Sequence, residues 1–317
     1  MKFSVIIPLY NKAPYVAKAV QSVLSQTLDD YELVIVDDGS TDQSAKIASK
    51  AIEGHDNCRM IRQENEGVSM ARNNGVAISY GDYLCFLDAD DWWNPCFLEE
   101  MAGLIAEFPD AGIYGTNYTI VNETKHKTRI APIGVEPGFE KGYINYCQVY
   151  AKTLAMPLTS ISVAMPRHVF EATGGFPEGI TLGEDFLLWI RIALKYKVVF
   201  LNKPLAFYNQ DVDVASRGIN NNYSPDTFMT FFFDQFMDDE AKNQDLKILL
   251  DRLRVHTLLY FRLNNLYPER VQTEIAKVDF SNVDAKYKLY YRAPLWAVKI
   301  HHGTAYRLSK IKNIILK

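Results

Sequence analysis

The stretch that decides the fold reads Tyr83-Leu84-Cys85-Phe86-Leu87-Asp88-Ala89-Asp90-Asp91. Its first five residues are apolar, which predicts a buried strand over 83–87, and three carboxylates follow directly. Ligands in open α/β sheets bind beyond the carboxyl ends of the strands. Carboxylates at i and i+2 of one turn can both reach a hard divalent cation, which usually shares its shell with substrate phosphates. The acidic turn is therefore a candidate metal-phosphate site, with an ordinary turn and helix cap as the structural alternative.

Short apolar runs alternate with amphipathic runs through the first 120 residues. This alternation is typical of strands and helices that wind into a mainly parallel sheet. It predicts an α/β fold in which helices flank a central, mainly parallel sheet. The predicted strands cover 3–8, 33–36, 58–61, 83–87 and 112–121, and the predicted helices cover 16–24, 68–79 and 94–105.

The later part of the chain has a different pattern. Residues 122–157 are rich in Pro, Gly and polar residues without a sustained period, which predicts a long and functional excursion. A strand over 159–165 and a helix over 183–196 follow, and from about 224 onward the pattern is helical and aromatic. We therefore predict a catalytic domain over 1–215 and a helical C-terminal region with a basic tail over 216–317.

Two further acidic clusters follow this pattern. Asp37-Asp38-Gly39-Ser40 ends the second predicted strand and lies at the same sheet edge, where one carboxylate can accept hydrogen bonds from a base or a ribose. Gly183-Glu184-Asp185 opens a predicted helix. Taken alone, helix capping explains the first cluster equally well, and stabilisation by the helix dipole is the favoured explanation of the second. The alternative for Asp185 is a general base that faces the same cleft.

Other chemistries lack their motifs. No G-x-G-x-x-G follows the first strand, and G-x-x-x-x-G-K-[ST], H-E-x-x-H and G-x-S-x-G do not occur. Dinucleotide redox chemistry, P-loop hydrolysis, zinc peptidase and esterase functions are therefore disfavoured. The sequence contains no apolar run long enough for a spanning helix and no secretory signal, so we expect a cytoplasmic protein.

Taken together, the motifs resemble those of the inverting glycosyltransferases of family 2, nucleotide-sugar enzymes with the GT-A fold. The matching segments span roughly residues 3–210 in the order and spacing of that family. They are Val5-Ile6-Ile7-Pro8-Leu9-Tyr10-Asn11, residues 34–42, Asn65-Glu66-Gly67, Ala71-Arg72-Asn73-Asn74-Gly75, residues 88–91, Gly174-Gly175-Phe176 and Gly183-Glu184-Asp185.

The resemblance implies roles for particular residues. Pro8, Tyr10 and Asp38 correspond to the wall of the nucleotide-base pocket, with Tyr10 stacked on the base, and Gly67 and Arg72 approach the nucleotide and its pyrophosphate. Asp90 resembles the metal-binding member of the D-x-D pair, Asp88 the member shared between ribose and metal, and Asp91 is a further candidate. Asp185 resembles the catalytic base and Glu184 its neighbour in the acceptor site.

The function implied is transfer of one sugar from a nucleotide sugar, with UDP as the first candidate, to a glycan or lipid-linked glycan hydroxyl. Mg²⁺ or Mn²⁺ would be the cofactor, and surface polysaccharide biosynthesis is the pathway that such relatives commonly serve. The alternatives are a catalytically inactive nucleotide- or glycan-binding relative and a nucleotidyltransferase. Residues 207–211, Phe207-Tyr208-Asn209-Gln210-Asp211, lack the His that many relatives place there. Arg217 is a candidate contact to diphosphate or acceptor if its loop closes, and a solvated arginine is the favoured alternative.

Charge is unevenly distributed along the chain. The formal net charge is −4, yet no acidic residue follows Asp284, and eight Lys or Arg residues do. Five Tyr and Trp residues are interleaved with these cations: Tyr287, Tyr290, Tyr291, Trp296 and Tyr306. A basic aromatic helix can lie on an anionic bilayer, which makes peripheral membrane association an expectation, with a packed helix and a solvated basic face as the alternative. No nucleic-acid partner is expected.

Overall fold

The structure is a computed structural model that describes residues 2–212 and 224–301 of the 317-residue chain. The chain divides into two compact units, Met1–Met229 and Thr230–Lys317. The boundary predicted after residue 215 lies outside the described residues, as do Arg217 and residues 302–317 of the basic tail.

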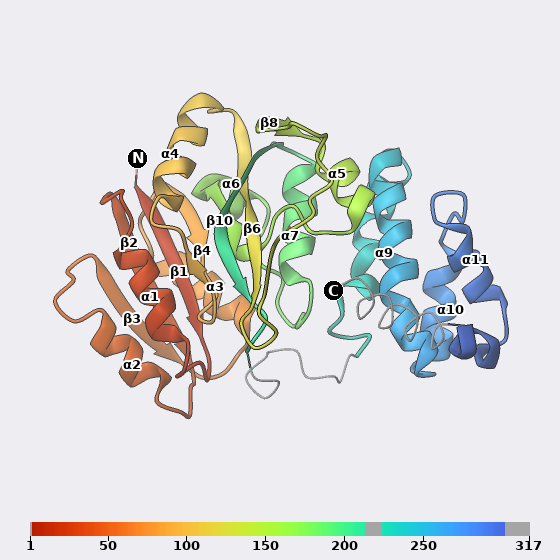
Figure 1. Ribbon diagram of the computed structural model, residues 1–317, viewed down its shortest axis with the longest axis horizontal. Coiled ribbons are helices and arrows are strands. Elements are labelled where there is room, and N and C mark those ends of the chain that lie inside the picture. The colour runs from red at the N-terminus through yellow and green to blue at the C-terminus, as the bar shows by residue number, and fades with distance from the viewer. Residues whose placement is uncertain (1, 213–223, 302–317) are drawn as a thin grey trace. The chain divides into compact units, whose positions relative to one another are not determined.

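The first unit is built on a ten-stranded mixed sheet with the strand order β3-β2-β1-β4-β9-β6-β10-β5, while β7 pairs with β6 and β8 with β10 (Figure 1). Strands β3, β2, β1 and β4 are parallel, and so are β6 and β10. The strand bounds are β1 Phe3–Leu9, β2 Tyr31–Asp38, β3 Cys58–Gln63, β4 Tyr83–Phe86, β5 Trp92–Trp93, β6 Ala111–Asn122, β7 Lys127–Ile130, β8 Lys141–Ile144, β9 Val163–Pro166 and β10 Lys197–Asn209.

Helices cover both faces of this sheet. The helix bounds are α1 Val16–Leu24, α2 Ser44–Ala51, α3 Val68–Ile78, α4 Phe97–Glu107, α5 Tyr146–Thr153, α6 Arg167–Ala172 and α7 Glu184–Ala193, with a short 3₁₀ turn, η1, at Ser160–Ser162. Leu33 and Ile35 of β2 belong to the same core as α1 and α4, whereas Val34 and Val36 pack with Ala71 of α3. This split follows the alternation of side chains along a strand, and it explains why β1 and β2 are buried along their whole length.

The predicted elements and the observed elements agree best in the first 121 residues. Three predictions need correction. The 122–157 excursion contains β7, β8 and α5, and the strand predicted over 159–165 begins only at Val163, after η1. The sequence pattern also gave no strand at 197–209, where β10 runs beside β6 with register shifts around Pro204.

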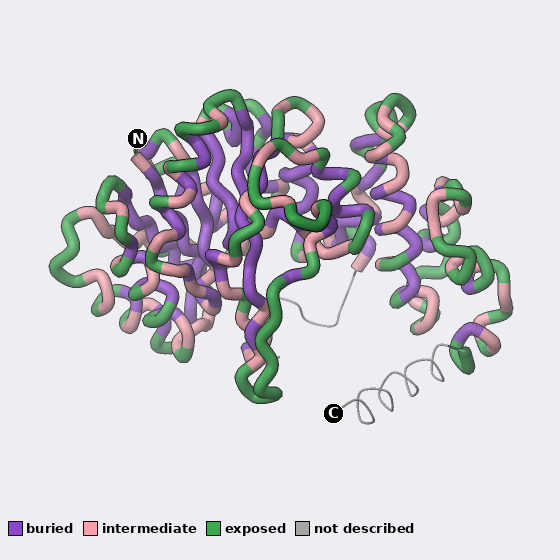
Figure 2. The backbone as a smooth tube through the Cα atoms, turned by 45° about the horizontal axis from the view of Figure 1, so that its top comes forward, coloured by how far each residue is buried: buried purple, intermediate pink, exposed green. Residues whose placement is uncertain are grey.

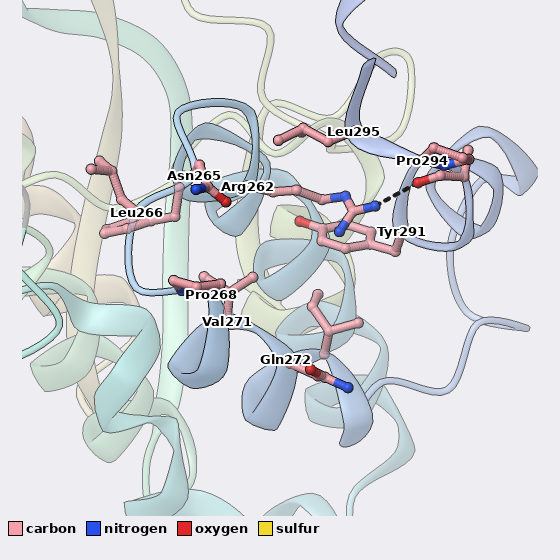
Figure 3. Close-up of a pocket in the computed structure, with 12 residues that line it drawn as sticks. Arg262, Asn265, Leu266, Pro268, Val271, Gln272, Tyr291, Pro294 and Leu295 are labelled. Atoms are coloured by element: carbon pink, nitrogen blue, oxygen red, sulfur yellow. Dashed lines mark hydrogen bonds between the residues drawn. The ribbon is translucent and has the colours of Figure 1, made fainter. Parts of the chain in front are cut away.

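The second unit is helical, as the sequence pattern predicts from about residue 224. Its elements are α8 Met237–Glu240, α9 Gln244–Leu263, α10 Pro268–Ala276 and α11 Ala285–Arg292, and the 3₁₀ segment η2 Met229–Phe236 leads into it. A cavity of about 390 Å³ lies in this unit, lined by α9, α10 and residues 291–295 (Figure 3). None of the predicted site residues lines this cavity. No described helix is both long and apolar enough to cross a membrane.

Candidate functional site

The carboxyl ends of β1, β2 and β4 meet at one edge of the sheet, where most of the predicted site residues lie. Leu9 of β1 pairs with Asp37 of β2, and Ile6 pairs with Phe86 of β4, so the loops after these three strands are neighbours. The register therefore brings together Tyr10, Asp38 and the acidic turn 88–91, which are far apart in the sequence. Pro8 lies buried within β1 itself.

The loop after β1 is bonded to the loop after β2. The Asn11 side-chain oxygen accepts from the Thr41 N–H at 2.9 Å, and the Lys12 N–H donates to the Ser44 hydroxyl at 2.7 Å. Asn11 has a φ of 49°, a left-handed conformation that Asn tolerates better than most residues. Tyr10 precedes this turn and is 45% exposed, so its ring is accessible to a ligand at the sheet edge.

Asp38 and Gly67 are joined directly. The buried Asp38 carboxylate accepts hydrogen bonds from the Gly67 N–H at 3.0 Å, the Glu66 N–H at 2.9 Å and the Gln63 side chain at 2.8 Å. Gly67 has a φ of 91°, which a side chain would strain, and it caps α3. Asp38 therefore fixes the loop that starts α3, and its contact with a nucleotide base stays a prediction.

The three carboxylates of the acidic turn have different surroundings. Asp90 forms an ion pair with Lys12 at 2.5 Å, and Asp88 forms one with Arg72 at 2.7 Å. Asp91 is buried and accepts from the Asn209 N–H at 2.7 Å, which joins the turn to the end of β10. Burial and the neighbouring Asp90 and Asp88 raise the pKa of Asp91 well above its ordinary value. Asp91 is thus built into the fold, whereas Asp88 and Asp90 keep 31% and 18% of their side chains exposed.

Arg72 connects the acidic turn to the start of α7. Its guanidinium donates to Asp88 at 2.7 Å, to Glu184 at 2.8 Å and to the Ser160 hydroxyl at 3.2 Å, and it lies 4.9 Å from the centre of the Phe176 ring. Burial opposes the charge on this side chain, but the two carboxylates outweigh burial and raise its pKa. Arg72 is only 2% exposed, so in the structure it joins Asp88 to Glu184, which are 96 residues apart in the sequence.

Glu184 and Asp185 form the first turn of α7, which begins at Gly183. This glycine has a φ of 86°, and a Cβ there would lie 2.3 Å from the Met229 sulfur, so the helix start requires glycine. Burial, with a further contribution from Glu184, raises the pKa of Asp185 to about 7, although Arg72 acts in the opposite direction. A carboxylate with this pKa is half-ionised near neutral pH, where a general base works best.

Tyrosines from α5 and β6 lie around this carboxylate. The Tyr150 ring packs edge-on against Phe186, the neighbour of Asp185, at 5.7 Å, and Tyr146 lies 5.9 Å from Tyr150. Burial, Tyr208 and Asp185 raise the pKa of Tyr118 to about 12, so this phenol stays neutral beside the carboxylate. The 122–157 excursion thus contributes to the surroundings of Asp185 through α5.

The carboxylate oxygens at the acidic turn fit a hard divalent cation whose coordination shell is completed by substrate oxygens. Asp88 and Asp90 offer carboxylate oxygens, and both are partly exposed. Across residues 2–212 and 224–301, no group of three His, Cys, Asp or Glu side chains is placed to hold a metal ion. Mg²⁺ is commonly held by one or two carboxylates together with substrate phosphates and water, which is the arrangement that these two aspartates allow.

Lys12 is the residue at this edge that sequence reasoning missed. Its ammonium lies against Asp90 and is 14% exposed. The signal was available, because Lys12 closely follows a strand whose carboxyl end was already assigned to the site. The partners of Arg72, in contrast, could not be read from the sequence, since they depend on how α3, β4 and α7 pack.

Comparisons with known proteins identify the family of this chain. A sequence model of the family described as "Glycosyl transferase family 2" matches residues 4–171, which is more than half of the chain. Glycosyltransferase GlyA of Streptococcus pneumoniae serotype 4 is 34% identical over 215 residues, covering 65% of this chain and 30% of that protein. An uncharacterised glycosyltransferase of Nostoc sp., alr2836, is 47% identical over 102 residues, about a third of each chain. The first curated relatives are thus matched over only about a third of their own length.

Solved structures agree on the fold. The S. aureus TarS 1-349 complex with UDP-GlcNAc superimposes with a TM-score of 0.60 at 21% identity, covering 93% of this chain and 77% of that one. The corresponding complex with UDP gives a TM-score of 0.58 at 20% identity, with 93% and 76% covered. The GT-A fold predicted from the sequence is confirmed. The chain belongs to glycosyl transferase family 2.

Proposed function

We propose that this glycosyltransferase moves one sugar from a nucleotide sugar, with UDP as the first candidate nucleotide, to a hydroxyl of a glycan or lipid-linked glycan. The observation that carries the proposal is the Arg72 bridge, which joins Asp88 at 2.7 Å to Glu184 at 2.8 Å. This bridge places two elements in one candidate active site. They are the acidic turn, which we expect to face the donor, and the first turn of α7. The UDP and UDP-GlcNAc complexes of TarS, which shares the fold, support a UDP-sugar as the first donor to test.

In the proposed reaction, Asp185 is the general base. Its pKa of about 7 leaves it substantially ionised at neutral pH, so it can take the proton from the acceptor hydroxyl as that oxygen attacks the anomeric carbon. The bond from the anomeric carbon to the diphosphate oxygen breaks, and the nucleoside diphosphate leaves with the electron pair. A single displacement of this kind inverts the anomeric carbon, so an α-linked donor gives a β-linked product.

The other site residues orient these groups. Glu184 accepts a hydrogen bond from Arg72 at 2.8 Å, which fixes the first turn of α7, and Tyr10 offers an exposed ring for the base. Asp88 and Asp90 would hold Mg²⁺ or Mn²⁺, which supplies Lewis-acid stabilisation of the departing diphosphate when bound. We assign the acceptor to surface polysaccharide assembly on the resemblance to family 2 alone.

The test is calorimetric titration of UDP, GDP and dTDP into the protein, each with Mn²⁺ and with EDTA. The proposal expects one nucleotide to bind, and to bind more tightly with Mn²⁺. If no nucleotide binds in either buffer, the transferase proposal fails and a glycan-binding relative becomes the better description. Binding followed by incorporation of a nucleoside monophosphate into product, instead of a sugar, would favour the nucleotidyltransferase.

A further inference from the structure

The most exposed large apolar side chains gather near the end of the second unit. Trp296 is 68% exposed, Ile300 63% and Leu289 61%, and among the described residues only Met237, at 64%, is comparable. All three lie within residues 285–301, where the chain carries no acidic side chain. Exposed apolar residues that gather on one short segment, in contrast to scattered ones, mark an interaction surface.

The same segment carries four exposed cations, Lys286, Lys288, Arg292 and Lys299. In α11, Leu289 is three residues from both Lys286 and Arg292, so the apolar side chain lies between cations on the helix surface. Residues 295–301 are also helical, which places Trp296 and Lys299 on neighbouring positions of one face. Asp284, just before the segment, lies 3.4 Å from Lys286 and is the acidic neighbour of this group.

The opposite side of the segment is held firmly on its own unit. Tyr290 and Val298 are buried and form a core cluster with Leu259 of α9. The Arg262 guanidinium donates to the Tyr290 carbonyl at 2.9 Å and to the Ala293 carbonyl at 2.7 Å, and Figure 3 shows it beside Tyr291. Figure 2 shows α11 and the residues after it as largely exposed or intermediate, with few buried positions. The segment is therefore anchored by one face while its basic and apolar side chains point outward.

We propose that residues 285–301 dock the second unit onto an anionic lipid bilayer surface. Trp296 and Leu289 enter the headgroup boundary, where an indole ring is favoured, and the four cations pair with anionic lipid headgroups. Burial of apolar area and attraction to anionic lipids both contribute to the binding of such helices. The proposal does not depend on the chemistry at the sheet edge. Membrane binding can therefore be tested separately from the proposed function.

The experiment is co-sedimentation of the full chain with vesicles of phosphatidylcholine alone and of phosphatidylcholine mixed with phosphatidylglycerol. We expect binding to the anionic vesicles only, weakened by salt. Trp296→Ala is expected to lower the partition coefficient by about tenfold or more, because a large apolar side chain is lost. Each of Lys288→Ala and Lys299→Ala is expected to lower it roughly fivefold.

Matched controls make the outcome decisive. Met237→Ala removes an equally exposed apolar side chain next to Asp238, Asp239 and Glu240, and Lys50→Ala removes an exposed lysine of α2. Both controls should bind as the parent chain does. Equal binding to the two vesicle types overturns the proposal. So does binding that the 285–301 substitutions leave unchanged, or that Met237→Ala reduces as much as Trp296→Ala, provided that circular dichroism shows each variant folded.

Discussion

Arg72 in the first unit and Arg254 in the second are both buried, and each joins carboxylates from distant parts of its own unit. Arg254 donates to both Glu240 oxygens, at 2.5 and 3.0 Å, and lies 3.6 Å from Asp251 and 3.7 Å from Glu274. All three of these carboxylates are nearly inaccessible, with 9% or less of each side chain exposed. Arg72, in contrast, pairs with Asp88, which keeps 31% of its side chain exposed.

The difference between the two arginines suggests how a ligand-binding site can be distinguished from a structural ion-pair network. Lys247 and Lys277 add positive charge around Arg254, so that network is close to self-contained. Around Arg72 there remain the partly exposed carboxylate of Asp88 and the nearby Asp185, the proposed base, whose pKa burial raises to about 7. A buried arginine with two carboxylates therefore indicates a functional centre only where one of its partners stays open to a ligand.

The largest effect should come from Asp185→Asn. The substitution removes the proposed base while keeping its shape, so we expect the transfer rate to fall roughly 10²- to 10⁴-fold. UDP affinity should change little, because the side chain is not expected to contact the nucleotide. Turnover assays and calorimetry on the same preparation measure both. An unchanged transfer rate would remove Asp185 from the mechanism.

The next largest effect should be a difference between substitutions of the two arginines. Removing one partner of a buried ion pair leaves uncompensated charge and typically costs about 3–5 kcal/mol, so Arg254→Met and Arg72→Met should both lower the melting temperature. Only Arg72→Met should also abolish the additional stabilisation that UDP with Mn²⁺ gives the parent chain. Thermal unfolding with and without UDP measures this contrast. If both variants keep the UDP response, Arg72 is structural in the same sense as Arg254.

A smaller effect is expected for Asp90→Ala. Loss of one cation ligand should weaken UDP binding in Mn²⁺ by at least the roughly 10- to 100-fold that loss of an outer-shell partner costs, while binding in EDTA stays the same. The effect tests whether the Lys12–Asp90 ion pair at 2.5 Å occupies a cation site. A change of equal size in EDTA would show that Asp90 only maintains the fold of the turn.

The pH dependence is a gradual effect. The Asp185 base must be ionised, so the transfer rate should rise about tenfold per pH unit below pH 7 and level off above it. The pKa is raised in the folded state, so Asp185 stabilises the fold at pH 4 and below. That stabilisation is lost as the pH rises from about 4 to 7, since the folded chain then binds more protons than the unfolded chain. Asp185→Asn should remove this part of the slope in urea unfolding.

The smallest effect should come from an exposed pair of the first unit. Lys141 and Glu107 are 45% and 46% exposed, and such pairs contribute about 0–1 kcal/mol. Lys141→Ala should therefore leave the melting temperature and the transfer rate nearly unchanged, which calibrates the two buried arginines. A loss as large as that of Arg254→Met would mean that exposure does not separate the two kinds of ion pair.

How much the sequence could predict differs between regions for physical reasons. Continuous apolar runs such as 33–36 belong to buried parallel strands, so their pattern suffices to predict β2. Strand β10 was not predicted because Asn202-Lys203-Pro204 interrupts its apolar residues. In the structure, the pairing of β10 with β6 shifts register at this interruption. Helix α5 was not predicted because it is short and has no long apolar period; among its buried residues, Tyr150 packs against Phe186, the neighbour of Asp185. In the site, residue types at strand ends were predictable, but the pairing of Lys12 with Asp90 and of Arg72 with Glu184 depends on packing.

The end of the sheet at β3 has a consequence for how copies of this chain avoid each other. A free sheet edge offers unpaired backbone groups to any passing strand, and natural proteins protect such edges with charge. β3 carries Arg59, which reaches back to Glu32 at 2.7 Å, and Arg62, whose side chain is 62% exposed. A second copy that added a strand here would have to strip water from these guanidinium groups. The charge on this edge therefore works against the addition of a strand from a second copy.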